Sequence, residues 1–179
     1  MKFKKTAIFD LDGTLVETDA ANGAAYRMAL NRLGVGKIAG FYGRISSDVV
    51  RTAMNLSSEE MDAVVRAKIK VYCRELWRTR LGPASDMFRC VLVHRSVFDK
   101  VVLLTDSSEQ RARETLARFD LARHFDEIVC NGGRGDKFAN YFGSFDSDPA
   151  ACVVWENEEG QIKSAIAAGV KVENIRKVR

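Results

Sequence analysis

From residue 101 onward, short apolar segments alternate with segments of helical spacing, and this alternation leaves few folds open to the chain. Residues 101–104, 127–130 and 151–155 have the length and apolar character of buried strands. Residues 6–9, which end at Asp10, form a similar run near the start. Because parallel neighbours need a connection of helix length, the alternation predicts a parallel sheet with helical crossovers.

Residues 17–83 interrupt this alternation after its first strand, because their pattern is purely helical. Ser57 and Glu60 form a capping box ahead of an apolar stripe with helical spacing. We therefore predict an α/β core formed by residues 1–16 and 84–179, with residues 17–83 inserted as a separate helical domain. A length of 179 residues fits one domain that carries such an insertion.

Charge and hydropathy exclude several classes of protein. The net charge of +4 is too small and too scattered to indicate nucleic-acid binding, although it suits an anionic substrate. No apolar run is long enough to predict a membrane-spanning helix, and the first residues do not resemble a signal peptide. The four cysteines form no CxxC pair and stand in apolar stretches, which predicts reduced, buried thiols and a cytoplasmic location.

Polar side chains follow each predicted strand, at the point where the strand ends. In open α/β sheets, ligands bind beyond the carboxyl ends of the strands, so these side chains are expected to converge on one edge. In chain order they are Asp10 and Asp12, then Thr105 and Asp106, then Lys137, and finally Glu156 and Asn157.

Residues 9–18, Phe-Asp-Leu-Asp-Gly-Thr-Leu-Val-Glu-Thr, resemble the first motif of the haloacid dehalogenase-like (HAD) phosphohydrolases, DxDGT after a strand. A helical insertion, a strand ending in Thr105, then Lys137, then acidic residues follow in the family's order. Residues 160–169 resemble the helix ending in Ala-Ala-Gly of phosphoglycolate phosphatase-like and β-phosphoglucomutase-like members. The resemblance implies a Rossmann-like, three-layer core around a parallel sheet, with the insertion as a helical cap.

The resemblance also implies an activity, a Mg²⁺-dependent phosphatase for a small, soluble phosphorylated metabolite. Asp10 would be the nucleophile that forms an aspartyl-phosphate, and Asp12 the general acid and base, with its backbone carbonyl on the metal. Thr105, beside Asp106, would hold a phosphoryl oxygen, and Lys137 would neutralise the nucleophile and the phosphate. Dehalogenases of the family lack the second aspartate, so dehalogenation is not expected.

The residues support this chemistry independently of the resemblance. Asp10 and Asp12 stand two apart on an extended chain, so their carboxylates leave the same side and can divide nucleophilic attack and proton transfer. Gly13 allows a sharp turn, which Thr14 can hydrogen-bond. A carboxylate that attacks a phosphate meets repulsion, and Mg²⁺ is the natural cation to neutralise it.

The DxDGT segment, Thr105 and Lys137 each also have a purely structural interpretation. The DxDGT segment could be a turn of solvated acids, and Lys137 by itself could be a surface lysine. Thr105 by itself could be a helix cap, but Ser107, with Gln110, is expected to fill that cap.

Two positions depart from the family pattern. Many relatives carry a metal-binding Asp at the second position after the fourth strand, where this chain has Asn157 after Glu156. An amide oxygen can still bind a metal without charge, and Glu156, or less readily Glu158, could compensate. Asp106 stands where many relatives have Asn, and its carboxylate would repel phosphate if it faced the site.

Arg44, in a loop of the insertion, is a candidate for substrate specificity, because a guanidinium can clamp a second anionic group; a solvated surface arginine is the alternative. Two other functions stay open. One is a phosphomutase on the same scaffold. The other is a catalytically degraded HAD-like protein that binds phosphate or a partner, suggested by Asn157 and Asp106.

Overall fold

The computed structural model describes residues 5–36, 45–145 and 147–178. The chain divides into two compact units. Residues up to Glu17 together with those from Leu81 onward form the first, which we call the core unit. Thr18–Arg80 form the second, the helical unit. Within the described residues, no helix combines the length and the apolar character needed to cross a bilayer.

The core unit is built on a five-stranded sheet in the order β5-β4-β1-β6-β7, in which every recorded pairing is parallel. Its strands are β1 (Thr6–Phe9), β4 (Lys100–Thr105), β5 (Glu127–Cys130), β6 (Cys152–Glu156) and β7 (Ile175–Lys177). Two further short strands, β2 (Val16–Glu17) and β3 (Arg80–Leu81), pair separately. The predicted α/β class with a parallel sheet is confirmed.

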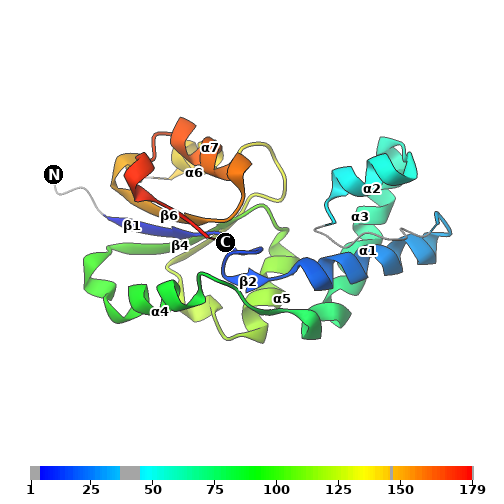
Figure 1. The fold of residues 1–179 in the computed structure, drawn as a ribbon, viewed down its shortest axis with the longest axis horizontal. Coiled ribbons are helices and arrows are strands. Elements are labelled where there is room, and N and C mark those ends of the chain that lie inside the picture. The colour runs from blue at the N-terminus through cyan, green and yellow to red at the C-terminus, as the bar shows by residue number, and fades with distance from the viewer. Residues whose placement is uncertain (1–4, 37–44, 146, 179) are drawn as a thin grey trace. The chain divides into compact units, whose positions relative to one another are not determined.

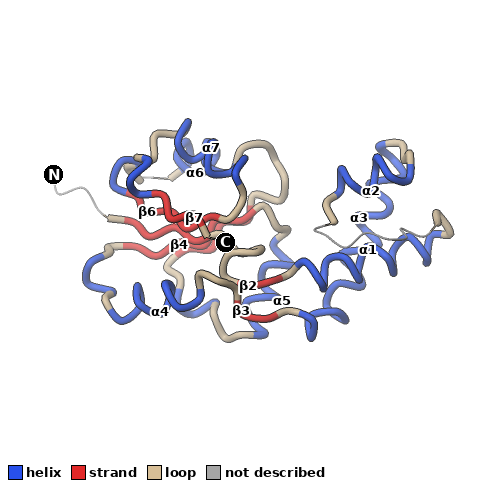
Figure 2. Tube along the Cα trace, viewed as in Figure 1, coloured by secondary structure: helices blue, strands red, loops and turns tan. Residues whose placement is uncertain are grey.

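Helices cover both faces of this sheet, which gives three layers (Figures 1 and 2). The helices α4 and α5 lie on one face and α6 and α7 on the other. Their bounds are α4 (Ser85–Val93), α5 (Glu109–Arg118), α6 (Lys137–Ser144) and α7 (Glu159–Ala167). Single 3₁₀ turns are found at Arg95–Val97, Ala122–His124, Pro149–Ala151 and Val172–Asn174.

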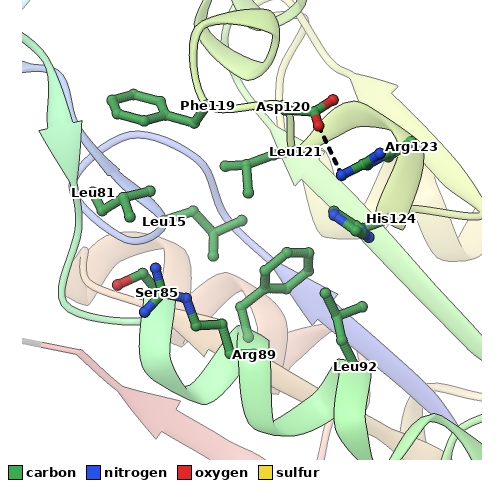
Figure 3. Close-up of a pocket in the computed structure, with 11 residues that line it drawn as sticks. Leu15, Leu81, Ser85, Arg89, Leu92, Phe119, Asp120, Leu121, Arg123 and His124 are labelled. Carbon is green, nitrogen blue, oxygen red and sulfur yellow. Dashed lines mark ion pairs between the residues drawn. The ribbon is translucent and has the colours of Figure 1, made fainter.

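A hollow of about 220 Å³ lies between α4 and the segment that follows α5. Figure 3 shows apolar side chains such as Leu15 and Leu121 pointing into it, with the Asp120–Arg123 ion pair at one side. None of the described candidate site residues lines it. The hollow is therefore separate from the edge where the predicted site residues gather.

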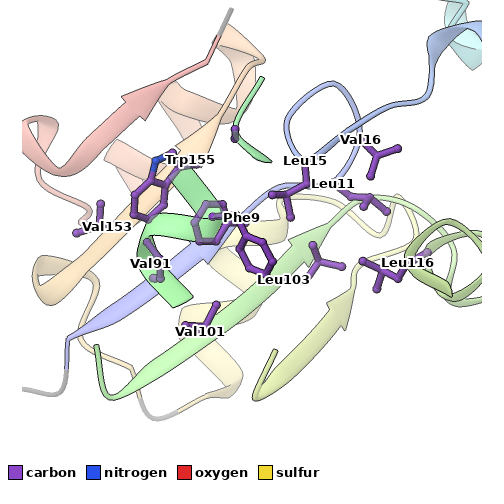
Figure 4. Packing of buried hydrophobic residues seen from close by; sticks show 14 residues of the cluster. Phe9, Leu11, Leu15, Val16, Val91, Val101, Leu103, Leu116, Val153 and Trp155 are labelled. Carbon is purple, nitrogen blue, oxygen red and sulfur yellow. The ribbon is translucent and has the colours of Figure 1, made fainter. Parts of the chain in front are cut away.

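The apolar core alternates along each strand, because successive side chains point to opposite faces. On the α4 and α5 face, Phe9 stacks on Trp155 with ring centroids 4.3 Å apart (Figure 4). Phe88 meets Phe9 edge-on. Ile8 and Val102 point to the other face, under α6 and α7. A strand that is buried on both faces reads as a continuous apolar run, which explains why these strands were visible in the sequence.

The helical unit contains α1 (Asp19–Leu33), α2 (Ser47–Met54) and α3 (Ser58–Tyr72), which continues as a 3₁₀ turn over Cys73–Arg78. The predicted capping box is present: Glu60 N–H donates to the Ser57 hydroxyl, and Ser57 N–H donates to the Glu60 carboxylate. This unit has its own apolar interior, in which Tyr26, Leu30 and Val64 are buried.

The prediction of four buried cysteines is confirmed only for Cys152. Cys73 and Cys90 are exposed, Cys130 is half-buried and Cys152 is buried, and all four are free thiols. Cys90 lies in an amphipathic helix, where the 3.6-residue period turns it outward between the buried Phe88 and Val91. An apolar neighbourhood in the sequence therefore did not mean burial.

Candidate active site

Asp10 directly follows β1, the central strand of the sheet, and lies between the carboxyl ends of its two neighbours. Phe9, the last residue of β1, is in register with Leu103 of β4 and Trp155 of β6. The Asp10 N–H donates to the carbonyl of Trp155 at 3.1 Å, which extends the pairing by one step. The backbone of the sheet therefore fixes the position of Asp10.

Lys137 joins two acidic side chains at this edge. Its ammonium lies 2.8 Å from Asp10 Oδ1 and 2.7 Å from Glu156 Oε2. All three residues are buried, with 2%, 7% and 1% of the surface of Lys137, Asp10 and Glu156 exposed. Asp136 caps α6 by accepting from the N–H groups of Phe138 and Ala139, which places Lys137 at the first residue of the helix.

Burial dominates the electrostatics of this triad. It raises the pKa of Asp10 to about 7; Lys137 opposes the rise, whereas the charges of Glu156 and Asp12 add to it. Burial also acts to lower the pKa of Lys137, but the Asp10 and Glu156 carboxylates outweigh it and raise that pKa above its ordinary value. Lys137 therefore stays positively charged. Burial makes the negative charge of the neighbouring Asp10 carboxylate unfavourable unless a further cation is present.

Glu156 also holds the loop that follows β6. Its Oε1 accepts from the N–H groups of Asn157 and Glu158, both at 3.0 Å, while its Oε2 accepts from Lys137. Both carboxylate oxygens are thus engaged, and the arrangement fixes where Asn157 lies.

Asp12 lies in a separate polar cluster with Ser107 and Arg111. The Ser107 hydroxyl donates to Asp12 Oδ2, and the Arg111 guanidinium donates to Asp12 Oδ1. The predicted cap role of Ser107 is wrong: Ser108 is the N-cap of α5, without a side-chain cap hydrogen bond. The helix starts one residue later than that prediction required, so the Ser107 hydroxyl is left to bind Asp12.

Thr105 is buried at the last position of β4. Its hydroxyl oxygen accepts from the N–H of Ser107 at 3.1 Å. Since this interaction uses an oxygen lone pair, the hydroxyl proton of Thr105 remains able to serve as a donor.

Asp106 is held by two amide side chains. Its Oδ1 accepts from Asn131 Nδ2 at 2.7 Å, and its Oδ2 accepts from Gln161 Nε2 at 2.9 Å. Asn131 Nδ2 also donates to the Gly135 carbonyl at 2.9 Å. The carboxylate of Asp106 thus ties together the segments that follow β4 and β5 and the start of α7, which an asparagine could do only in part.

Asn157 packs against the turn of the DxDGT segment. Gly13 has φ +80°, and a Cβ atom built there would lie 2.4 Å from Asn157 Nδ2. The Thr14 hydroxyl donates to Asn157 Oδ1 at 3.2 Å, rather than to its own turn as predicted. The second position after β6 is therefore in direct contact with the first motif.

The structure thus brings seven of the eight candidate residues to one edge of the core unit. Arg44, the eighth, lies outside the described residues. Sequence reasoning missed the roles of Ser107 and Arg111 around Asp12, and of Asn131 and Gln161 around Asp106. The signal available for Arg111 was its place four residues after Ser107, on a helix that follows directly from the strand edge.

The family model for haloacid dehalogenase-like hydrolases matches residues 7–160. The chain therefore belongs to this family, as the resemblance implied. Structures of the family share the fold: a haloacid dehalogenase-like family hydrolase from Streptococcus pneumoniae superimposes with a TM-score of 0.71 at 18% identity, over 96% of this chain and 84% of that one.

Two characterised relatives are phosphatases. The chain is 24% identical to the fructose-1-phosphate phosphatase YqaB of Escherichia coli, over 94% of this chain and 95% of the relative. It is 24% identical to a phosphorylated carbohydrates phosphatase of Thermotoga maritima, over 93% of this chain and 82% of that one. The predicted enzyme class, a HAD-like phosphatase, is confirmed.

Proposed function

We propose that this phosphatase hydrolyses a small phosphorylated carbohydrate through an aspartyl-phosphate on Asp10, with Mg²⁺ as cofactor. The observation that carries the proposal is the buried triad in which Lys137 bridges Asp10 and Glu156. A buried cation next to a carboxylate at the carboxyl edge of the sheet is suited to receive a dianionic phosphate and to direct a carboxylate oxygen at it.

In the first half of the reaction, a carboxylate oxygen of Asp10 forms a bond to phosphorus. The bond between phosphorus and the ester oxygen breaks, and that oxygen takes a proton from Asp12. In the second half, water attacks the same phosphorus and gives its proton to Asp12. The bond between phosphorus and Asp10 breaks, which releases inorganic phosphate and restores both carboxyl groups.

Three groups are assigned to the phosphoryl oxygens. Thr105 donates its hydroxyl proton, because the hydrogen bond from Ser107 N–H uses only a lone pair of the hydroxyl oxygen. Lys137 contributes charge, and Asp106 contributes its backbone N–H. The amide partners of the Asp106 carboxylate hold that side chain in the loop network, so the acid at this position is compatible with phosphate binding.

The described residues fit a magnesium ion by the chemistry of their donors. Within the described ranges, no three His, Cys, Asp or Glu side chains form a metal-binding group, so a site must use other oxygens as well. The set we assign is the Asp10 carboxylate, the Asp12 backbone carbonyl and Asn157 Oδ1, which are the hard ligands that Mg²⁺ prefers. A role for Glu156 at the metal stays a prediction. When bound, Mg²⁺ neutralises charge as the nucleophile approaches the phosphate.

The class of substrate follows from the two relatives, whose names specify fructose 1-phosphate and phosphorylated carbohydrates. A specificity role for Arg44, a cap role for the helical unit and a cytoplasmic location stay predictions.

The test is a panel of sugar phosphates with p-nitrophenyl phosphate, assayed for released phosphate with and without Mg²⁺. We expect Mg²⁺-dependent turnover of at least one sugar phosphate, and loss of turnover in Asp10→Asn. The circular dichroism spectrum of that variant should match the wild type. Turnover that survives in a folded Asp10→Asn protein would contradict the covalent mechanism, and transfer of phosphate to a second sugar hydroxyl would indicate the phosphomutase.

A further inference from the structure

Asp12 accepts hydrogen bonds from two residues outside the proposed phosphate and metal sites, Ser107 and Arg111. We propose that Arg111 is a positioning residue: with Ser107, it orients the Asp12 carboxyl group for proton exchange with the leaving oxygen and with water. This inference rests on the proposed function and adds to it a residue of α5 that is assigned neither to the phosphate nor to the metal.

The geometry leaves Asp12 little rotational freedom. Ser107 donates to one carboxylate oxygen and Arg111 to the other, so rotation of the group about its last bond would break both contacts. The side chains of Arg111 and Asp12 are each only 14% exposed, and Ser107 is buried. At this burial the pair is shielded from solvent screening, unlike ion pairs on the surface.

The fold places both donors through one short connection. Ser107 lies two residues beyond the end of β4, and Arg111 lies in the first turns of α5. The Ser107 N–H is itself fixed to the Thr105 hydroxyl, so the donor to Asp12 and the proposed phosphate ligand share one rigid segment. The shared segment therefore fixes where Asp12 lies relative to the bound phosphate. Proton transfer to the leaving oxygen requires such a fixed geometry.

The alternative is that the ion pair between Arg111 and Asp12 only stabilises the fold. The basicity of the leaving group distinguishes this structural role from a positioning role. A positioned acid matters most when the departing oxygen is strongly basic, as in an alkyl phosphate such as a sugar phosphate. p-Nitrophenolate is a weak base that departs without a proton. Loss of positioning should therefore lower kcat/KM for the sugar phosphate much more than for p-nitrophenyl phosphate, whereas a loss of folded protein lowers both equally.

The experiment compares wild type, Arg111→Ala, Arg111→Lys and Ser107→Ala on these two substrates with Mg²⁺ present. The matched control is Arg113→Ala, because Arg113 is an exposed arginine of the same helix, paired with Glu109 on the surface. We expect Arg111→Ala to lose about 10- to 100-fold in kcat/KM on the sugar phosphate and less than about threefold on p-nitrophenyl phosphate. Arg111→Lys should recover most of the loss, Ser107→Ala should show the same preference more weakly, and the control should match wild type.

Equal losses on both substrates, or no loss on either, in a folded Arg111→Ala protein would overturn the inference and leave the proposed function intact. If Arg111→Ala does not fold, Ser107→Ala decides by the same criterion. Wild-type protein that hydrolyses no phosphomonoester in the panel would overturn the proposed function, and this inference with it.

Discussion

The side chain of Asn157 lies directly against Gly13, where a Cβ atom would come within 2.4 Å of Asn157 Nδ2. The two residues are far apart in the sequence, and the contact fits together the turn after β1 and the loop after β6. Both the positive φ of Gly13 and the absence of a side chain are therefore required at this position.

Gly13→Ala should displace Asn157 and weaken the site. We expect the free energy of unfolding to fall by about 1–3 kcal/mol from backbone strain, and Mg²⁺ binding to weaken in addition. Gly34→Ala is the matched control: Gly34 also has positive φ, but nothing lies within 4 Å of its Cβ position. Calorimetric titration with Mg²⁺ should separate them, and equal Mg²⁺ affinity in both variants would argue against a role for the Asn157 contact.

Asn157→Asp should tighten Mg²⁺ binding, because it adds a full negative charge to the proposed donor set. An opposite charge at contact distance contributes a few kcal/mol even at an effective dielectric constant of about 20, so the gain should be on the order of tenfold or more. Asn31→Asp, at an exposed position of α1, changes the net charge equally and should leave the affinity unchanged. An unchanged affinity in Asn157→Asp would place position 157 away from the metal.

Lys137→Met should destabilise the core unit severely. It would leave Asp10 and Glu156 buried without their shared cation, and loss of one partner from a buried pair typically costs about 3–5 kcal/mol. Lys177→Met, which breaks the exposed pair with Glu159, should cost at most about 1 kcal/mol. Urea denaturation measures both, and a similar small cost in the two variants would show that the buried triad contributes little stability.

Asp136 should give the protein a specific sensitivity to acid. Burial acts to raise its pKa, but hydrogen bonds from the backbone of Ala139 and Phe138 contribute to lowering it below the ordinary 3.8. Since its folded-state pKa is lowered, its contribution to stability is present above pH 3.8 and is lost as the pH falls further. Asp136→Asn can still cap the helix but cannot titrate.

The urea midpoint of wild type should therefore fall more than that of Asp136→Asn between pH 5 and pH 3. A constant difference between the two proteins across this range would contradict the assigned cause.

Three of the four predicted strands, β1, β4 and β6, are buried on both faces of the sheet. The central strands are continuous apolar runs with polar residues at their ends, so their positions and the convergence of Asp10, Thr105 and Lys137 followed from pattern alone. The strand β7 and the helix α4 were not predicted. β7 has only three residues, two of them Arg176 and Lys177, and α4 has only two buried residues, Phe88 and Val91.

The fine structure of the site could not be predicted, because it depends on which partner each side chain finds. Nothing in the sequence indicates that Asp106 is held by Asn131 and Gln161, or that Arg111 reaches Asp12. A one-residue difference in the start of α5 decided whether Ser107 capped a helix or bound the aspartate.

The central place of β1 has a consequence for how the protein is made. Its two neighbours, β4 and β6, are synthesised long after it, so the first strand leaves the ribosome without a partner on either side. Asp10 is translated before its surroundings are complete, because β6 and Glu156 follow both β1 and β4 in the chain. A product that stops short of residue 152 would carry the whole DxDGT motif and still lack β6, which pairs with β1, so the arrangement around Asp10 requires translation to proceed through β6.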